Sequence, residues 1–216
     1  MQPDGSRPAN DSKRWLILEL VLLFAAIPAL FLVDLPRPIT VAVIITALLY
    51  VIGRTVRLRL IPRAALLSVR FHDWKAHLLL FASFALLSAV GVALYEPSLL
   101  FRPPRQHPRL WLTFLLVYSI LSVYPQTFVF RGYFLERYRP LFPHRGHLII
   151  ANALLFAWAH AIIAHPLVYA LSFCGGILFS ITYLRNRSLL VTAIEHALYG
   201  SWLFTVGIGG MFAFPI

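Results

Sequence analysis

The sequence predicts an all-α integral membrane protein, a polytopic helical bundle that crosses the bilayer about seven times. Sixty per cent of its 216 residues are apolar and only 12% are charged, whereas an ordinary globular chain is about half apolar and about a quarter charged. The apolar residues also fall in uninterrupted runs, and a hydrocarbon core of about 30 Å needs roughly 20 such residues per helix. Composition and run length therefore exclude a soluble domain.

Seven apolar runs are long enough, or nearly long enough, to span the bilayer. They are Trp15–Val33, Ile39–Val51, Ala76–Tyr95, Trp111–Phe130, Leu148–Ala164, Leu167–Leu184 and Leu189–Phe214. The second run is short and needs either local thinning of the bilayer or extension through Gly53. The last run is long, so we expect it to tilt or break near Gly207–Gly210.

The basic residues predict the orientation of the chain. The net charge is +11, with 19 Lys and Arg residues. If the N-terminus is cytoplasmic, only four of them fall on outer segments: Arg37, Arg102, Arg105 and Arg109. This is the positive-inside bias, and it predicts an N-in, C-out topology. The positive charge then indicates contact with lipid headgroups of the bilayer rather than with nucleic acid.

The two ends of the chain differ in character. Residues 1–14 are polar and are predicted to be a disordered cytoplasmic N-terminus, followed by a single membrane domain over residues 15–216. The first apolar run exceeds the 7–15 residues of a signal-peptide core, so we interpret it as an uncleaved anchor. A single cysteine, Cys174, excludes an intrachain disulfide and a metal site built from several cysteines.

Polar side chains inside the apolar runs are the strongest functional signal. Burying an ionisable group in the bilayer costs at least ~2.5–3.5 kcal/mol, so each such residue indicates a structural or functional role. Those within or at the ends of the runs are Glu19, Gln126, Thr127, Arg131, Asn152, His160, Glu195 and His196. All except Glu19 fall on the fourth, fifth and seventh runs, so we expect them to meet in one pocket that opens to the cytoplasm.

Spacing by four places side chains on one face of a helix. Asn152, Phe156 and His160 share a face of the fifth run in this way, and His196 and Gly200 share one on the seventh. Two imidazoles from different helices suit Zn²⁺, although a third protein ligand is missing. The alternative is that both histidines hydrogen-bond to backbone carbonyls or serines across helices. The pattern by itself leaves both interpretations open.

Three short motifs, taken in order, resemble a known family. They are QTFVFRG at 126–132, FAWAH at 156–160 and HALYG at 196–200. Their order and their placement on successive apolar runs resemble the CPBP family of intramembrane proteins, which contains type II CAAX prenyl endopeptidases and bacterial bacteriocin-processing and self-immunity proteins. The resemblance covers a family-like core of about residues 110–212.

The resemblance implies an intramembrane metalloprotease, placed in the bacterial inner (cytoplasmic) membrane. By position, it implies that His160 and His196 hold a zinc ion, that Arg131 is the family's arginine and that Phe156 packs the site. Asn152 shares a face with Phe156 and His160 and is expected to support the site.

Three positions depart from the family pattern. Gln126 and Thr127 stand where the family has two glutamates, and Gly200 stands where it has an asparagine. In the family the first glutamate activates a metal-bound water, and a Gln amide cannot act as a general base near neutral pH. The candidate replacements are Glu195, which could orient a histidine, and Glu19.

Glu136 is a weaker candidate base, because it could return to the site only if the chain folds back at Gly132. The sequence therefore leaves open whether the protein is an enzyme. One hypothesis is a zinc-dependent intramembrane endopeptidase that cleaves peptide or membrane-protein substrates in a pocket open to the cytoplasm. The alternative is a catalytically impaired pseudoprotease that binds a peptide, a lipid or a membrane partner, in immunity or as a scaffold. A transporter is less supported, since the sequence has no inverted repeat.

Overall fold

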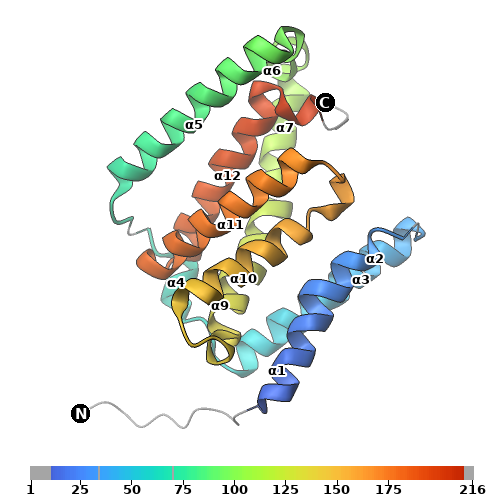
Figure 1. The fold of residues 1–216 in the computed structure, drawn as a ribbon, viewed down its shortest axis with the longest axis vertical. Helices are drawn as coiled ribbons and strands as arrows, with labels where there is room; N and C mark the ends of the chain where they lie inside the picture. Colours follow the sequence, from blue (N-terminus) through green and yellow to red (C-terminus); the bar gives the residue numbers. More distant parts are fainter. Residues whose placement is uncertain (1–10, 34, 70, 212–216) are drawn as a thin grey trace. The chain divides into compact units, whose positions relative to one another are not determined.

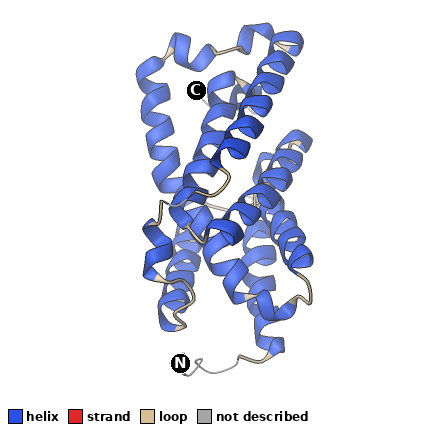
Figure 2. Ribbon diagram, turned by 90° about the vertical axis from the view of Figure 1, so that its left-hand side faces the viewer, coloured by secondary structure: helices blue, strands red, loops and turns tan. Residues whose placement is uncertain are grey.

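The structure is a computed structural model that describes residues 11–33, 35–69 and 71–211, and all regular secondary structure in these ranges is helical (Figure 2). The prediction of an all-α protein is confirmed. The chain divides into two compact units. The N-unit comprises Met1–Pro62 and Gly132–Ile177, and the C-unit comprises Arg63–Arg131 and Leu178–Ile216. The single membrane domain over residues 15–216 stays a prediction, and residues 1–10 of the predicted disordered N-terminus lie outside the described residues.

The described residues contain six helices that are long and apolar enough to cross a membrane. They are Arg37–Arg57, Trp74–Tyr95, Pro108–Arg137, Arg145–Ile163, Pro166–Asn186 and Leu189–Val206. Each matches a predicted run, and the second run is extended through Gly53 as its short length required. The polytopic helical fold is thereby confirmed, while the total of seven spans and the N-in, C-out orientation stay predictions.

The predicted first span, Trp15–Val33, is not among these six, because its 18-residue helical stretch carries three charged side chains, Lys13, Arg14 and Glu19. The backbone is helical from Lys13 to Leu30 but is divided into α1 (Lys13–Leu20), the π-helical η1 (Val21–Ala26) and α2 (Ile27–Leu30). Pro28 lacks the N–H that a regular α-helix would direct to the carbonyl four residues earlier. The turn before it therefore widens into a π-helix, the usual form of such an interruption.

The remaining helices follow these bounds. They are α3 (Arg37–Arg57), α4 (Arg63–Leu67), α5 (Trp74–Tyr95), η2 (Pro97–Leu99), α6 (Arg102–Gln106), α7 (Pro108–Tyr118), η3 (Ser119–Val123), α8 (Tyr124–Thr127), η4 (Phe128–Tyr133), α9 (Phe134–Arg137), η5 (Arg139–Leu141), α10 (Arg145–Trp158), η6 (Ala161–Ile163), α11 (Pro166–Asn186), α12 (Leu189–Val206) and α13 (Ile208–Met211). Helices α7 to α9 form one continuous rod, and Figure 1 shows its first half beside α12.

In the N-unit, aromatic and small residues form the packing core. Phe24 of η1 meets Phe134 and Tyr138 edge to face, with ring centroids 4.9 and 5.8 Å apart, a favoured aromatic geometry. Gly176 of α11 lies so close to Ala153 of α10 that a Cβ there would be 2.7 Å from the Ala153 Cα. Small residues at such positions let membrane helices approach closely.

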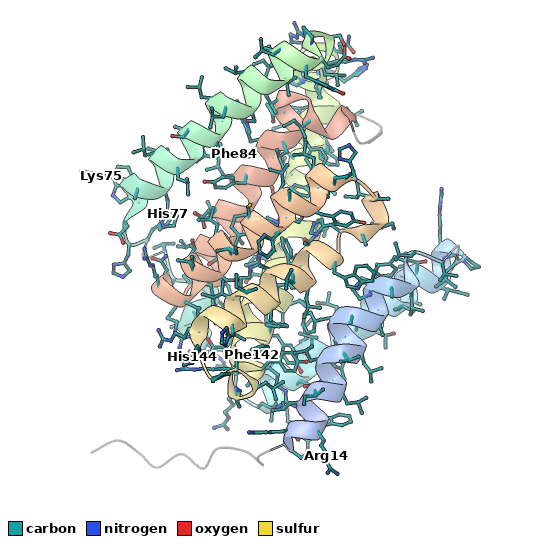
Figure 3. The ribbon with its side chains drawn as sticks, in the orientation of Figure 1. Arg14, Lys75, His77, Phe84, Phe142 and His144 are labelled. Carbon is teal, nitrogen blue, oxygen red and sulfur yellow. The ribbon has the colours of Figure 1, made fainter. Side chains whose placement is uncertain are left out.

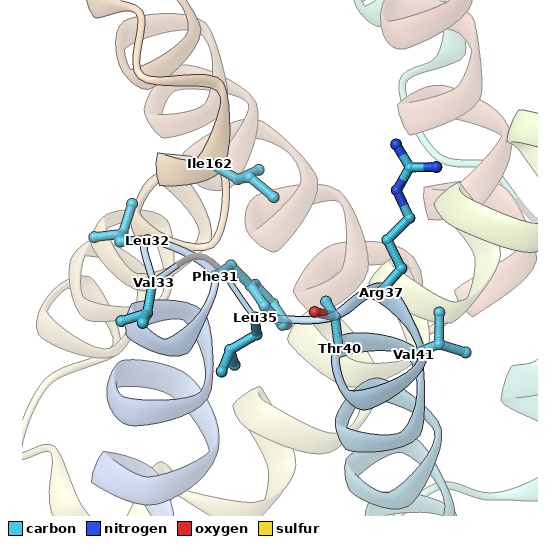
Figure 4. Close-up of a pocket in the computed structure, with 8 residues that line it drawn as sticks. All are labelled: Phe31, Leu32, Val33, Leu35, Arg37, Thr40, Val41 and Ile162. Atoms are coloured by element: carbon cyan, nitrogen blue, oxygen red, sulfur yellow. The ribbon is translucent and has the colours of Figure 1, made fainter.

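The N-unit also has a hollow of about 470 Å³ beside the turn between α2 and α3 (Figure 4). Its lining residues are Phe31, Leu32, Val33, Leu35, Arg37, Thr40, Val41 and Ile162. Apolar side chains dominate, and the predicted site residues lie elsewhere.

In the C-unit, α12 is the central helix. It contacts α4, α5, α6, α7 and α8, and its far end packs Val206 against Val92 and Ile208. The helix ends at Gly207, whose φ is +108°, a conformation that favours glycine. The predicted break near Gly207–Gly210 is therefore confirmed, and it lies at Gly207.

Candidate functional site

A proline shapes the helix that carries the first family motif. Pro125 precedes Gln126 and Thr127 and cannot donate a backbone hydrogen bond to the preceding turn. That turn, Ser119–Val123, is π-helical. Widened turns of this kind change which side chains face a neighbouring helix and occur often at functional sites.

The structure brings Thr127 and His196 together in the C-unit. The Thr127 hydroxyl of α8 lies 3.3 Å from Nδ1 of His196 on α12. Both side chains are buried, with Thr127 1% exposed and His196 6% exposed. The hydroxyl thus bonds to the imidazole at the position where the family resemblance expects a glutamate.

A phenylalanine that the sequence analysis missed completes the surroundings of His196. Phe179 of α11 stacks on the imidazole, with ring centroids 4.6 Å apart and planes inclined by 26°. The guanidinium carbon of Arg131 lies 5.5 Å from the centroid of the same Phe179 ring, within the range of a cation–π interaction. Arg131, Phe179 and His196 therefore form one packed group. A search restricted to polar residues in apolar runs could not find Phe179.

Gln126 is oriented by its own helix. Its amide nitrogen donates to the Ser122 hydroxyl at 2.8 Å. Its Oε1 atom is buried and has no hydrogen-bond partner among the residues that the structure describes. A buried acceptor without a donor is costly, so this amide leaves one hydrogen-bonding position for a ligand.

Glu195 pairs with a histidine, but with a different one from its sequence neighbour. Its Oε1 lies 2.5 Å from Nδ1 of His77 on α5, and both side chains are largely buried. Figure 3 shows His77 near the start of α5, on the same helix as Lys75 and Phe84. The expectation that Glu195 could orient a histidine thus has its counterpart in His77, which the sequence analysis missed because no spacing pattern links it to the family motifs.

The predicted residues of the fifth run lie in the N-unit. Asn152 and Phe156 are buried on α10, but that helix ends at Trp158, so His160 lies in the turn beyond it and not on the predicted helical face. The His160 backbone N–H bonds to the Ala157 carbonyl at 3.0 Å. Its Nδ1 hydrogen-bonds to the Phe156 carbonyl oxygen at 2.8 Å. The imidazole therefore caps the end of α10, where the last carbonyls of a helix lack a backbone partner.

The imidazole orientation of His160 is fixed by this bond. A carbonyl only accepts, so Nδ1 must carry the proton, and in the neutral ring Nε2 is the basic nitrogen. The His160 ring also meets Phe156 edge to face at 4.8 Å. Phe156 therefore packs against His160.

Glu19, a candidate replacement base, belongs to a buried charge cluster in the N-unit. Arg137 donates to Glu19 Oε2 at 2.8 Å and to Asp11 Oδ2 at 2.6 Å. Arg54 donates to Asp11 at 2.5 Å, and Tyr50 donates to Glu19 Oε1 at 2.5 Å. Two carboxylates and two guanidiniums balance each other, so the partners of Glu19 mark it as a structural residue.

The chain does not fold back at Gly132. The helical backbone continues through η4 and α9 to Arg137. The condition under which Glu136 could return toward Gln126 is therefore not met.

Comparison with protein families places all three motifs within one matched region. Residues 108–202, slightly less than half of the chain, match the family described as Type II CAAX prenyl endopeptidase Rce1-like. The family resemblance is confirmed. Comparison with curated proteins found no match, and comparison with solved structures found none either. Together with the six apolar helices, the match identifies an integral membrane protein with an Rce1-like, protease-related region.

The Rce1-like region contains the predicted site residues other than Glu19, and the two units divide these residues between them. Gln126, Thr127, Arg131, Glu195 and His196 belong to the C-unit. Asn152, Phe156 and His160 belong to the N-unit.

The donor set of the Rce1-like region falls short of a zinc site. Catalytic zinc takes three protein ligands and leaves a position open. Among the residues that the structure describes, no group of three or more His, Cys, Asp or Glu side chains could hold a metal ion. Two imidazoles, His160 and His196, leave at least one ligand to be supplied, so zinc binding stays a prediction.

Proposed function

We propose that this protein is an intramembrane protease-like protein of the CPBP type whose site binds a peptide segment without hydrolysing it. The observation that supports this most directly is the bond between Thr127 and His196. A neutral hydroxyl occupies the place where the family has a carboxylate, and it is held there by the histidine that the family uses as a metal ligand.

Hydrolysis of an amide needs a group that can take a proton from water. Neither the Gln126 amide nor the Thr127 hydroxyl can do so near neutral pH. The described carboxylates of the C-unit are engaged elsewhere: Glu195 with His77, Glu96 with Ser98, and Asp73 with Arg185. The described contacts of this unit therefore place no carboxylate on Gln126 or Thr127, where the family has its base.

The same residues are suited to binding a peptide. Gln126 Oε1 is a buried acceptor with no donor among the described residues, and a peptide N–H would satisfy it. Inside a bilayer, an unwound peptide segment needs such partners because lipid offers none. Neutral amide and hydroxyl groups provide them without the desolvation cost of a charge.

A second candidate, a zinc-dependent endopeptidase, is favoured by one observation. The His160 Nδ1–H donates to the Phe156 carbonyl, the arrangement by which proteins commonly orient a metal-binding imidazole. His160 and His196 are the residues that would hold the ion. A third ligand and a base are needed before this candidate becomes the better one.

Location and partners are part of the proposal. The bias of basic residues supports a site that faces the cytoplasm, and the family resemblance supports the bacterial inner membrane. The partners are then the lipid bilayer and a peptide or membrane-protein segment.

Purified full-length protein in detergent separates the two candidates. We expect no cleavage of a membrane-protein substrate and no stoichiometric zinc by elemental analysis, in the wild type and in His160→Ala and His196→Ala alike. Stoichiometric zinc that is lost in both variants, together with cleavage by the wild type, would overturn the proposal. Gln126→Glu combined with Thr127→Glu tests whether a base is what the site lacks.

A further inference from the structure

The face of α12 that carries His196 continues one turn later at Gly200. There the space for a side chain is taken by Tyr118 of α7. A Cβ on Gly200 would lie 2.9 Å from Cζ and 3.0 Å from Cε1 of Tyr118, and closer still to its hydroxyl oxygen. Real Cβ atoms essentially never approach other heavy atoms more closely than 3.0 Å. Tyr118 can therefore occupy this position only because residue 200 is a glycine.

Two other rings fix the Tyr118 ring in this position. It stacks on Phe114, with centroids 5.8 Å apart and planes inclined by 10°. On another side it meets Phe204 of α12 edge to face, at 5.2 Å and 73°. A ring held by neighbours from both helices cannot turn aside without disturbing the packing of α7 on α12.

The π-helical stretch explains how Tyr118 and Thr127 both reach α12. Nine residues of a regular α-helix turn through about two and a half revolutions, which would place the two side chains on opposite faces. Ser119–Val123 lies between them and is π-helical. A π-helix rotates through a smaller angle per residue than an α-helix does. Both side chains therefore face α12, with Thr127 at His196 and Tyr118 at Gly200.

We infer that Tyr118 belongs to the binding site and that its hydroxyl, supplied by α7, replaces the side chain that Gly200 lacks. This inference rests on the proposed peptide binding and names a specificity-determining residue for it. A phenol both donates and accepts a hydrogen bond. The Tyr118 hydroxyl lies beside the Thr127–His196 pair on the same face of α12, and as a donor it would bind a backbone carbonyl of a peptide segment.

Restoring the family's asparagine at position 200 should destabilise the protein. Asparagine cannot enter while Tyr118 occupies the space. Gly200→Asn alone is expected to lower the melting temperature of the full-length protein in detergent by roughly 5–10 °C. Tyr118→Ala removes the obstruction, so the double variant should melt well above the value expected from adding the two single effects. Strictly additive effects, or a Gly200→Asn variant as stable as the wild type, would overturn the inferred exchange of side chains.

Tyr118→Phe tests the hydroxyl apart from the packing, since it keeps the ring. The probe is a 20-residue Leu–Ala peptide that a central Gly–Pro pair unwinds beside a benzophenone, placed with the full-length protein in phosphatidylcholine vesicles. We expect the photocrosslinking yield of Tyr118→Phe to fall at least about threefold, with an unchanged melting temperature. Tyr124→Phe, on the same helical rod, is the matched control and should crosslink like the wild type.

The outcomes separate this inference from the function on which it rests. Wild-type yield in Tyr118→Phe would overturn the role of the hydroxyl while leaving peptide binding intact. Absence of crosslinking to the wild type would overturn the peptide binding itself, and with it the role of the hydroxyl. The melting temperatures of the Gly200 and Tyr118 variants would still decide the side-chain exchange.

Discussion

The main polar cluster of the N-unit is charged, whereas the contacts of Gln126 and Thr127 in the C-unit are neutral, although the C-unit also buries Arg131 and Glu195. In the N-unit, Glu19 and Arg137 are both buried and ionisable, and with Asp11 and Arg54 they form a charge-balanced cluster. In the C-unit, Thr127 and Gln126 stand where the related family has carboxylates, and they engage His196 and Ser122 through neutral hydrogen bonds. Full charges are kept where they have a structural partner.

This difference has an energetic reason. A buried charge is tolerated only with a partner of opposite sign, because its desolvation cost is several kcal/mol. A glutamate at a protease site has to remain reactive, and its negative charge is offset by a metal ion. A site that binds no metal would bear the cost of that charge without the compensation, and neutral residues at the same positions avoid it. Gln126 and Thr127 are neutral residues of this kind.

Arg137→Ala should have the largest effect, because it leaves Glu19 and Asp11 without their main partner. Breaking a buried ion pair by removing one member costs about 3–5 kcal/mol. We expect a corresponding fall in the melting temperature of the purified protein. Arg139→Ala, an exposed arginine two residues on, is the matched control. Equal melting temperatures for the two variants would show that the cluster contributes nothing to stability.

His77→Ala removes the partner of Glu195, the buried carboxylate of the C-unit. Glu195 is 3% exposed and loses the imidazole that bonds to its Oε1. An unsatisfied buried group costs about 1–3 kcal/mol, so the loss should be smaller than for Arg137→Ala. His72→Ala removes an exposed imidazole near the same end of α5 and serves as the control. If His77→Ala were as stable as that control, the need of a buried charge for a partner would be shown for the N-unit only.

Thr127→Val should be mild by comparison, because it removes one neutral hydrogen bond while keeping the side-chain shape. We expect a loss of about 0.5–1.5 kcal/mol, measured by chemical unfolding in detergent. Thr113→Val, at an exposed position of α7, controls for the substitution itself. A loss as large as that of Arg137→Ala would mean that the Thr127–His196 contact is more than a neutral bond.

The smallest expected effect is the acid dependence of Asp11. Burial acts against its ionised form, but the guanidiniums of Arg137 and Arg54 outweigh this and hold its pKa below the usual 3.8. A lowered pKa stabilises the fold above the unfolded-state value, and that stability is lost as the pH falls through the folded-state value. Because the carboxylate is partly exposed, we expect only about 0.2–1 kcal/mol. Melting temperatures between pH 6 and pH 3 should fall less in Asp11→Asn than in the wild type, and identical slopes would contradict the assignment.

Most of the fold followed from hydropathy because bilayer thickness sets helix length. Six predicted runs became helices whose ends shifted by a few residues, and the break at Gly207 followed from the glycine-rich end of the last run. The division of the first run could be anticipated only from Pro28, which an average of hydropathy conceals. The order of the three motifs was enough to identify the family.

The site was only partly predictable, because tertiary contacts decide its composition. Thr127 and His196 were both singled out from the motifs, and they meet in the structure. Tyr118, Phe179 and His77 were missed, since an aromatic residue in an apolar run gives no signal until its neighbours are known. Tyr118 was further concealed by the π-helical turns, which defeat any argument from α-helical spacing.

Those turns also affect how this region tolerates changes in length. The stretch Ser119–Val123 has more residues per turn than the helix on either side of it. It is therefore equivalent to an α-helix with an inserted residue. Deleting a single residue there would restore regular α-helix and rotate the following residues by about 100°. Gln126 and Thr127 would then leave the α12 face together. An alignment could record such a deletion as a harmless gap, although it would remove the site as a whole.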